Sequence, residues 1–478
     1  MRNSISTSLR TILLLTAAVI ISFSCSKDDE EYTFTFTSPA QYFTFGAKQT
    51  VTYIISPNVR NISISSQPAG WSAEVNTSTR TVTVTAPVSL DQYQDDDDKT
   101  VTPVNSGTLV LRGDVGDKSV TASYYVSLGS VEDLTAIHAN CFIITKPETG
   151  YRFSAVRPDG SAVTGIESAA VAWASERYLI RYVDCKDGKI TFTTNDNDDG
   201  ELMEGNALIA ARNAEGEILW CWHLWVTAAQ PEENAVQMNG YTFMGCNLGA
   251  FGNSTDDNDL TLASYGLYYQ WGRPSPFPRP RNYNCAGSAT QYMYDSELVQ
   301  VTMAVEEFDA AQYGSIEAAL ASPLTFVTGL EQPWQSANGG LTWRDDVKTV
   351  YDPCPAGWRV PQSSAFAGVT IDAAELTGDM DTLGRQYGWT LTDGAQSAFF
   401  FAGGRRSYYN GAVINMNTQE TPKPWEGFYW SSTLDASRAT AAGLFFDLDT
   451  ESAGGSRIVP ARSLQLSNGL QIRCVKEQ

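Results

Sequence analysis

The stretch that decides the fold is residues 207–226, which read ALIAARNAEGEILWCWHLWV. Two apolar runs flank the polar segment Asn213–Gly216, a pattern typical of a β-hairpin. Successive side chains of a strand point to opposite faces, and the second run is largely apolar on both. We therefore predict a strand that is buried on both sides. An alternative is that Trp220, Trp222 and Trp225 form a platform on which sugars stack.

Short strands of the same kind precede this hairpin. Tyr32–Thr37 and Thr81–Thr85 alternate with a period of two, and Thr108–Arg112 and Val120–Leu128 are further strand-like runs. Regular short strands with turn signals between them indicate a sandwich of about seven strands. We predict one β-sandwich over residues 32–129 and a second over residues 130–230. Trp71 is expected in the core of the first.

Charge and length restrict the class of protein. The chain has 478 residues, enough for about three domains. With 54 acidic against 32 basic residues, its formal charge is −22. Such a surface argues against nucleic acid as a partner and against electrostatic attraction to anionic lipid.

The N-terminus indicates export. Arg2 and Arg10 give a basic start, and Thr11–Ile21 is apolar but short for a membrane span. The following Ser22–Cys25 resembles the lipobox of bacterial lipoproteins, which implies a signal peptide over residues 1–24 and a lipid on Cys25. An ordinary signal peptide with a chance cysteine is the alternative.

An acidic tether over residues 25–31 follows. A lysine followed by acidic residues directly after the cysteine resembles the surface-display signal of Bacteroidota lipoproteins. This resemblance implies an outer-membrane protein that faces outside the cell.

Two further resemblances concern domains. The region around Trp71 resembles immunoglobulin-like modules, including those called BACON. After a linker at Pro231–Ala235, residues 236–478 resemble the Fibrobacter succinogenes major paralogous domain, which is C-type-lectin-like. The motifs that carry this second resemblance are Asn247–Ala250, Ala263–Arg273, Tyr351–Pro361, Gly427–Thr433 and Gly469–Val475.

The resemblances together imply a multidomain fold: two all-β immunoglobulin-like sandwiches followed by an α+β C-type-lectin-like domain. The family's recurrent cysteine pair implies a disulfide between Cys354 and Cys474. Short helices are expected at Ser315–Leu320 and Ser363–Val369, each with a serine available as N-cap.

Aromatic residues with arginines beside them are the candidates for ligand binding. These candidates are Trp271, Arg273, Trp425 and Trp430. Core packing is the alternative reading, since large aromatic side chains dominate protein cores. The sugar- and calcium-binding loops of calcium-dependent lectins are not present, so no metal ligands are assigned. Asp95–Asp98 and Asn195–Gly200 are acidic segments that could bind calcium, although a loop is the simpler interpretation of both.

No residue is assigned a catalytic role or a cofactor. The chain has two histidines, His138 and His223, and lacks a nucleophile elbow, a P-loop and a dinucleotide-binding fingerprint. We therefore predict a non-catalytic surface protein for adhesion or ligand binding, with glycans or surface proteins as partners. One alternative is a fimbria-associated structural or tip subunit. The other is a polysaccharide-degrading enzyme, because two carboxylates suffice for glycoside hydrolysis.

Overall fold

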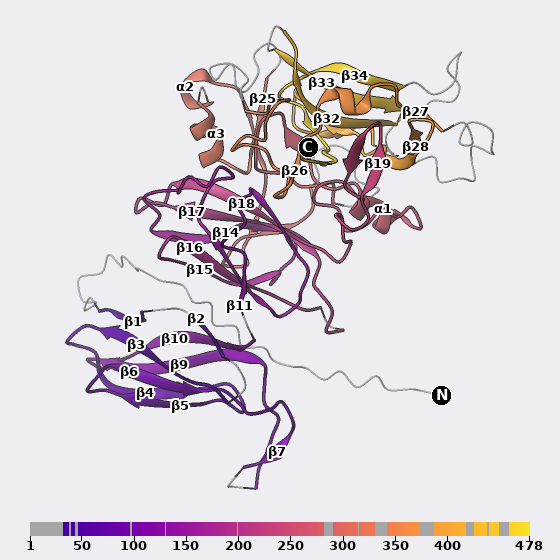
Figure 1. The fold of residues 1–478 in the computed structure, drawn as a ribbon. Coiled ribbons are helices and arrows are strands. Elements are labelled where there is room, and N and C mark those ends of the chain that lie inside the picture. The colour runs from indigo at the N-terminus through magenta and orange to yellow at the C-terminus, as the bar shows by residue number, and fades with distance from the viewer. Residues whose placement is uncertain are drawn as a thin grey trace, which may run out of the picture. The chain divides into compact units, whose positions relative to one another are not determined.

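The computed structural model of this chain is built mainly of β-strands (Figure 1). It describes residues 32–37, 40–43, 46–95, 98–129, 131–197, 199–281, 290–313, 315–329, 342–372, 387–416, 425–436, 439–448 and 458–478. The predicted signal peptide, Cys25 and the tether lie outside these residues. The chain divides into two compact units, residues 1–132 and 133–478. Within the described residues, no helix has the length and apolar character needed to cross a membrane.

The first unit is a sandwich of two four-stranded sheets. In strand order, one sheet comprises β1 (Phe34–Phe36), β3 (Lys48–Ile55), β6 (Thr81–Thr85) and β5 (Ser72–Asn76); the other comprises β2 (Ala40–Phe43), β10 (Lys118–Leu128), β9 (Ser106–Val115) and β4 (Arg60–Ser66). A small β-ribbon, β7 (Tyr93–Gln94) with β8 (Thr100–Val101), flanks the acidic Asp95–Asp98 segment, in which residues 96 and 97 are not among the described residues.

Period-two alternation explains the core of this unit. In β6 the two valines are buried and the three threonines are partly exposed, so one face of the strand packs inward. Trp71 is also in this core, where its indole N–H donates to the carbonyl of Val104 at 2.9 Å. The two-sheet sandwich and the core position of Trp71 are thus confirmed.

The second unit begins with two more sheets. A four-stranded sheet has the order β11 (Val131–Asp133), β13 (Gly150–Ser154), β16 (Lys189–Thr194) and β15 (Ile180–Lys186). A six-stranded sheet has the order β12 (Cys141–Ile144), β18 (Ile218–Val226), β17 (Gly205–Arg212), β14 (Ser168–Ala174), β22 (Met293–Tyr294) and β23 (Gln300–Val301). The predicted hairpin is confirmed as β17 and β18, which pair antiparallel with Ile209 opposite Trp222.

Strand β18 is buried from Trp220 to Val226, as its two apolar faces predict. Trp220, Trp222 and Trp225 are at most 2% exposed, so the alternative of a tryptophan platform for sugars is wrong.

Residues on both sides of the Pro231–Ala235 linker share one core. Trp222 in β18, and Trp271 and Trp430 from the C-terminal region, belong to the same cluster of buried residues. Strands β22 and β23 also extend the sheet that contains β18. The two domains expected at residues 130–230 and 236–478 therefore pack as one compact unit.

The C-terminal region consists of several small sheets. Two of these sheets have four strands, in the orders β19 (Val236–Met238), β20 (Tyr241–Phe243), β36 (Val475–Lys476), β26 (Trp358–Arg359) and β21 (Tyr269–Gln270), β35 (Gly469–Leu470), β30 (Arg405–Arg406), β31 (Val413–Ile414). Two have three strands, in the orders β27 (Thr370–Ile371), β28 (Gly388–Thr392), β29 (Ser397–Phe401) and β32 (Glu426–Leu434), β33 (Thr440–Asp447), β34 (Ile458–Gln465). A two-stranded sheet pairs β24 (Ala304–Glu307) with β25 (Thr325–Thr328). A disulfide joins Cys354 to Cys474 and so links the segment before β26 to the segment before β36.

Short helices interrupt these sheets. They are α1 (Asn258–Ser264), α2 (Ala310–Tyr313) and α3 (Ile316–Ala321). The helix expected at 315–320 is confirmed as α3, and the Ser315 hydroxyl accepts a hydrogen bond from the N–H of Ala318. The helix expected at 363–369 is a 3₁₀ helix over Ser363–Phe366, and its N-cap, Gln362, makes no side-chain capping bond.

Candidate ligand-binding site

The predicted ligand-binding residues are mostly core residues. Trp271, Arg273 and Trp430 have no exposed area, and Trp425 is half-buried. The indole N–H groups of Trp271 and Trp430 donate to the carbonyls of Ser431 and Tyr269 at 2.8 and 2.7 Å. A ligand could not reach these three side chains, so assigning them to a ligand site was wrong. The alternative reading, core packing, is correct for them.

Arg273 explains why the sequence suggested a site here. Its guanidinium donates to the carbonyls of Thr325, Ala319 and Ser322 at 2.9 to 3.1 Å and lies over the ring of Phe277. Burial lowers the pKa of this guanidinium to about 10. Its planar fork of donors satisfies backbone carbonyls at the end of α3 and at the start of β25.

Arg406 and Arg473 have the same task. Arg406 donates to the carbonyls of Pro278 and Gly411, and Arg473 donates to those of Met244, Gly245 and Phe399. Both arginines are buried. The aromatic and arginine motifs of the C-terminal region therefore hold the fold together.

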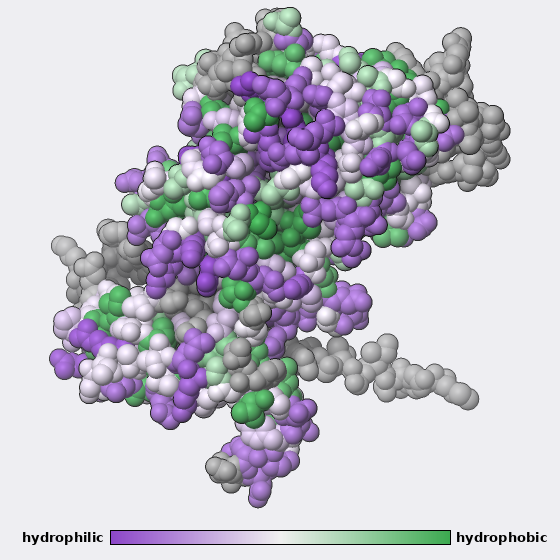
Figure 2. Space-filling model, in the orientation of Figure 1, coloured by the Kyte–Doolittle hydropathy of each residue, from purple (hydrophilic) through white to green (hydrophobic). Residues whose placement is uncertain are grey.

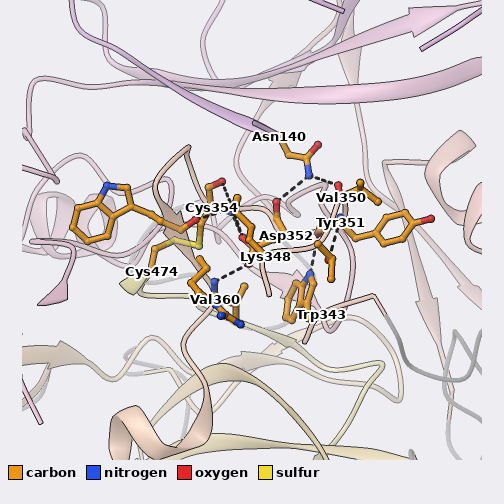
Figure 3. A network of polar contacts seen from close by, with 12 residues as sticks. Asn140, Trp343, Lys348, Val350, Tyr351, Asp352, Cys354, Val360 and Cys474 are labelled. Carbon is orange, nitrogen blue, oxygen red and sulfur yellow. Dashed lines mark hydrogen bonds and ion pairs between the residues drawn. A yellow bond between two sulfur atoms is a disulfide. The ribbon is translucent and has the colours of Figure 1, made fainter. Parts of the chain in front are cut away.

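A buried ion pair forms the centre of a second structural network (Figure 3). The ammonium of Lys348 contacts the carboxylate of Asp352 at 2.8 Å and donates to the carbonyls of Cys354 and Trp358. The Asp352 carboxylate also accepts the N–H groups of Cys354 and Val360, each at 2.9 Å. Since these partners occupy the donors of the ammonium and both carboxylate oxygens, the pair is a structural element beside the disulfide.

Asn140 connects this network to the six-stranded sheet. Its amide donates to the carbonyls of Val350 and Asp352 at 2.8 and 2.9 Å, as Figure 3 shows, and its oxygen accepts the indole N–H of Trp220. All of these groups lie within the second unit, so they help to explain why it packs as one body.

The buried histidine is not available as a catalytic base. His223 in β18 is 1% exposed, and its Nε2 lies 2.8 Å from the side-chain oxygen of Asn206. Burial lowers its pKa to about 3, so the ring is neutral at pH 7. Within the described residues, no group of three or more His, Cys, Asp or Glu side chains could hold a metal ion.

An open groove of about 470 Å³ in the second unit brings together chemically different side chains. It lies where the segment after β14, the loop between β16 and β17, and β22 meet. Its lining residues are Glu176, Arg177, Asn197, Leu202, Met203, Glu204 and Tyr294. Figure 2 shows hydrophilic residues over much of the visible face, with apolar residues in small clusters between them.

The loop that carries Asn197 is the hairpin loop expected at Asn195–Gly200. A bridge between Asp196 and Leu202 closes it, and Gly200 has a positive φ of 80°. The Asn197 side-chain oxygen accepts the N–H groups of Asp199 and Glu201, which holds the turn. Leu202 and Met203 follow directly, so the turn positions an apolar part of the groove next to an amide.

The two carboxylates of the groove have partners inside the protein. One oxygen of Glu204 accepts the hydroxyl of Thr227 and the N–H of Ala228 at 2.9 and 2.7 Å. Burial raises the pKa of Glu176, and the nearby guanidinium of Arg279 opposes this effect. Arg177 lies over the ring of Tyr294, with its Cζ 4.7 Å from the ring centroid.

The sequence did not reveal this groove. Its residues come from positions 176–177, 197–204 and 294, and none of them belongs to a motif of known spacing. The only signal was the turn at 195–200, which was read as a loop.

Comparisons with known proteins give little further guidance. No protein family matches the chain, and no curated protein does. Solved structures that resemble part of it include a chimeric titin Z1Z2 (16% identity, 41% of this chain and 96% of that chain, TM-score 0.14). The D00-D0 domain of intimin has 14% identity over 41% of this chain and 96% of that chain, with a TM-score of 0.16. An endo-fucoidan hydrolase of glycoside hydrolase family 107 has 8% identity over 40% of this chain and 28% of that chain, with a TM-score of 0.15.

Proposed function

We propose that this protein is a lipid-anchored surface protein that binds glycans without turning them over, and that the groove at Tyr294 is the binding site. The observation that carries the proposal is the mixture of groups in one open groove: an aromatic ring, a guanidinium, an amide, two carboxylates and an apolar patch. Ligand sites combine apolar and aromatic surface with a few placed polar groups. A sugar has both an apolar ring face and hydroxyls that need hydrogen-bond partners, so this mixture suits it.

The amide of Asn197 supports this reading. Its oxygen holds the loop, whereas its NH₂ group has no hydrogen-bond partner among the described residues. An NH₂ group offers two donors, which a sugar hydroxyl or ring oxygen can accept. The turn thus fixes the position of the donor before the ligand arrives.

Attachment to the outer membrane rests on the sequence, through the lipid predicted on Cys25. A tether over residues 25–31 would hold both units at the membrane surface. The acidic charge of −22 suits a protein that stays soluble there and avoids anionic lipid.

A glycan array tests the proposal. The lipid-free protein from Ser26 to Gln478 would be screened with and without calcium. We expect saturable binding that does not need calcium, because no group of three or more His, Cys, Asp or Glu side chains among the described residues could hold a metal ion. Absence of binding by folded protein, or binding that calcium alone confers, would contradict the proposal.

A polysaccharide hydrolase is a second candidate, favoured by one observation. Two carboxylates line the same groove, and burial raises the pKa of Glu176, as a general acid requires. If this candidate is right, reducing ends appear when a bound glycan is incubated with the protein, and Glu176→Gln abolishes them. Binding without any release of reducing ends favours the non-catalytic proposal.

A further inference from the structure

A second tyrosine, Tyr292, lies two positions before Tyr294 in the chain. Gln291 and Met293 are buried, whereas Tyr292 is 46% exposed and Tyr294 is half-buried. This alternation places both tyrosines on the outer side of an extended segment. Two residues of such a segment span about 6.6 Å, which sets the spacing of the two tyrosines along the chain, and we call Tyr292 and Tyr294 the strip.

Each ring of this strip carries an arginine. The Cζ of Arg281 lies 4.5 Å from the centroid of the Tyr292 ring, and that of Arg177 lies 4.7 Å from the centroid of the Tyr294 ring. A guanidinium held over a ring keeps the N–H groups at its edge available, and these groups match the oxygens of a carboxylate or sulfate.

The two arginines of this strip carry positive charge close to several carboxylates. Neither Arg177 nor Arg281 forms an ion pair within the part of the chain that the structure describes. The neighbouring acids keep their charge, but each has another partner. Glu204 accepts two hydrogen bonds, Glu176 interacts with Arg279, and one oxygen of Asp295 accepts the N–H groups of Glu297 and Val299.

Arg177 and Arg281 are exposed cations on a protein of charge −22. Among the described residues, Arg281 makes a long hydrogen bond of 3.3 Å to the carbonyl of Thr290, and Arg177 makes none. This differs from Arg273, Arg406 and Arg473, whose donors satisfy buried carbonyls.

We infer that the strip of Tyr292 and Tyr294, with Arg281 and Arg177, selects anionic glycans, whose sugar rings would pack on the tyrosines while their sulfate or carboxylate groups pair with the arginines. The inference rests on the proposed function and gives the chemical class of its ligand.

Matched polysaccharides test it. Binding would be measured for a sulfated polysaccharide and its desulfated form, and for a uronate polymer and its carboxyl-reduced form. We expect the anionic member of at least one pair to bind more tightly by tenfold or more. The pair that shows the preference identifies sulfate or carboxylate as the recognised group.

Variants locate the effect. Arg177→Gln and Arg281→Gln should each weaken binding of the anionic polymer by roughly tenfold, the size expected for one charged hydrogen-bonding partner, and should weaken binding of its neutral form by much less. Arg112→Gln is the control, because Arg112 is exposed in the first unit, where it is paired with Asp114. The steepness of the salt dependence should also fall in the two groove variants only.

The outcomes separate the two claims. Equal binding of the anionic and neutral forms would overturn the inference and leave the proposed function standing. Equal binding of polyphosphate, which carries charge without sugar rings, would also overturn it. No binding to any saccharide by folded protein would overturn both claims.

Discussion

His223 shows how one buried residue controls the pH dependence of stability. Burial holds its pKa at about 3, below its ordinary value of 6.5. Below pH 6.5 the unfolded chain therefore binds a proton that the folded protein does not. The stability that His223 contributes is complete above pH 6.5 and is lost as the pH falls toward 3, by about 1.4 kcal/mol per pH unit.

The prediction at this residue concerns urea unfolding at pH 7 and pH 4.5. The wild type should lose more free energy of unfolding between these pH values than His223→Gln, by roughly 2–3 kcal/mol. His138→Gln is the control, since His138 is exposed and should keep the wild-type pH dependence. Identical pH dependence in His223→Gln and wild type would contradict the neutral, buried ring.

The ion pair of Lys348 and Asp352 gives a second prediction at this scale. Their side chains are 9% and 5% exposed. Lys348→Met would leave the Asp352 carboxylate buried without its cation, so we expect a loss of about 3–5 kcal/mol in the free energy of unfolding.

The matched control is Arg344→Met, which breaks the exposed pair of Arg344 with Asp346 and should change stability very little. Chemical denaturation of the three proteins measures both values. Similar small losses in both variants would show that the Lys348 network does not stabilise the fold.

At the scale of elements, the disulfide fixes the last strands. Cys354 and Cys474 are 120 residues apart in the sequence, and each lies next to a strand of the sheet that contains β26 and β36. A cross-link over such a long loop restricts the unfolded chain strongly. Replacing both cysteines with alanine should lower the free energy of unfolding by about 4–5 kcal/mol.

Cys185→Ser provides the comparison, because Cys185 is a half-buried free cysteine. We expect a much smaller change there, and reduction of the wild type should reproduce the loss seen in the double alanine variant. Equal stability of the double variant and Cys185→Ser would contradict a stabilising role for the disulfide.

Local patterns predicted the elements better than their assembly. The β17–β18 hairpin, the alternation in β6 and the cap of α3 depend on neighbouring residues, and all three agree with the sequence. The 3₁₀ helix at Ser363 is shorter than expected. Its four residues lie against strands of the C-terminal region, and such tertiary packing routinely overrides local preference.

At the scale of the whole molecule, the assembly depends on contacts that no local pattern shows. The amide of Asn140 donates to the carbonyl of Asp352, which lies 212 positions along the chain. The short strand β22 joins a sheet whose longer strands all lie before residue 227. The sequence therefore suggested a boundary near Pro231 where the structure has a continuous core. For the same reason it could not reveal a groove built from three separate segments.

Burial is the second property that the sequence could not settle. The sequence of a tryptophan beside an arginine is the same whether the two residues bind a ligand or pack in a core. The indole N–H groups of Trp271 and Trp430 and the guanidinium of Arg273 donate hydrogen bonds to backbone carbonyls of the protein. None of the three side chains has exposed surface. The pairs of Arg281 with Tyr292 and of Arg177 with Tyr294 use the same residue chemistry, but they keep exposed surface.

The most direct test of the account is the affinity of Tyr294→Ala for the glycan that binds the wild type best. Tyr409→Ala serves as the matched control, because Tyr409 is 64% exposed and does not line the groove. Measured by titration calorimetry, Tyr294→Ala should weaken binding by tenfold or more, whereas Tyr409→Ala should bind as the wild type does. Unchanged affinity in folded Tyr294→Ala would contradict the claim that this groove is the binding site.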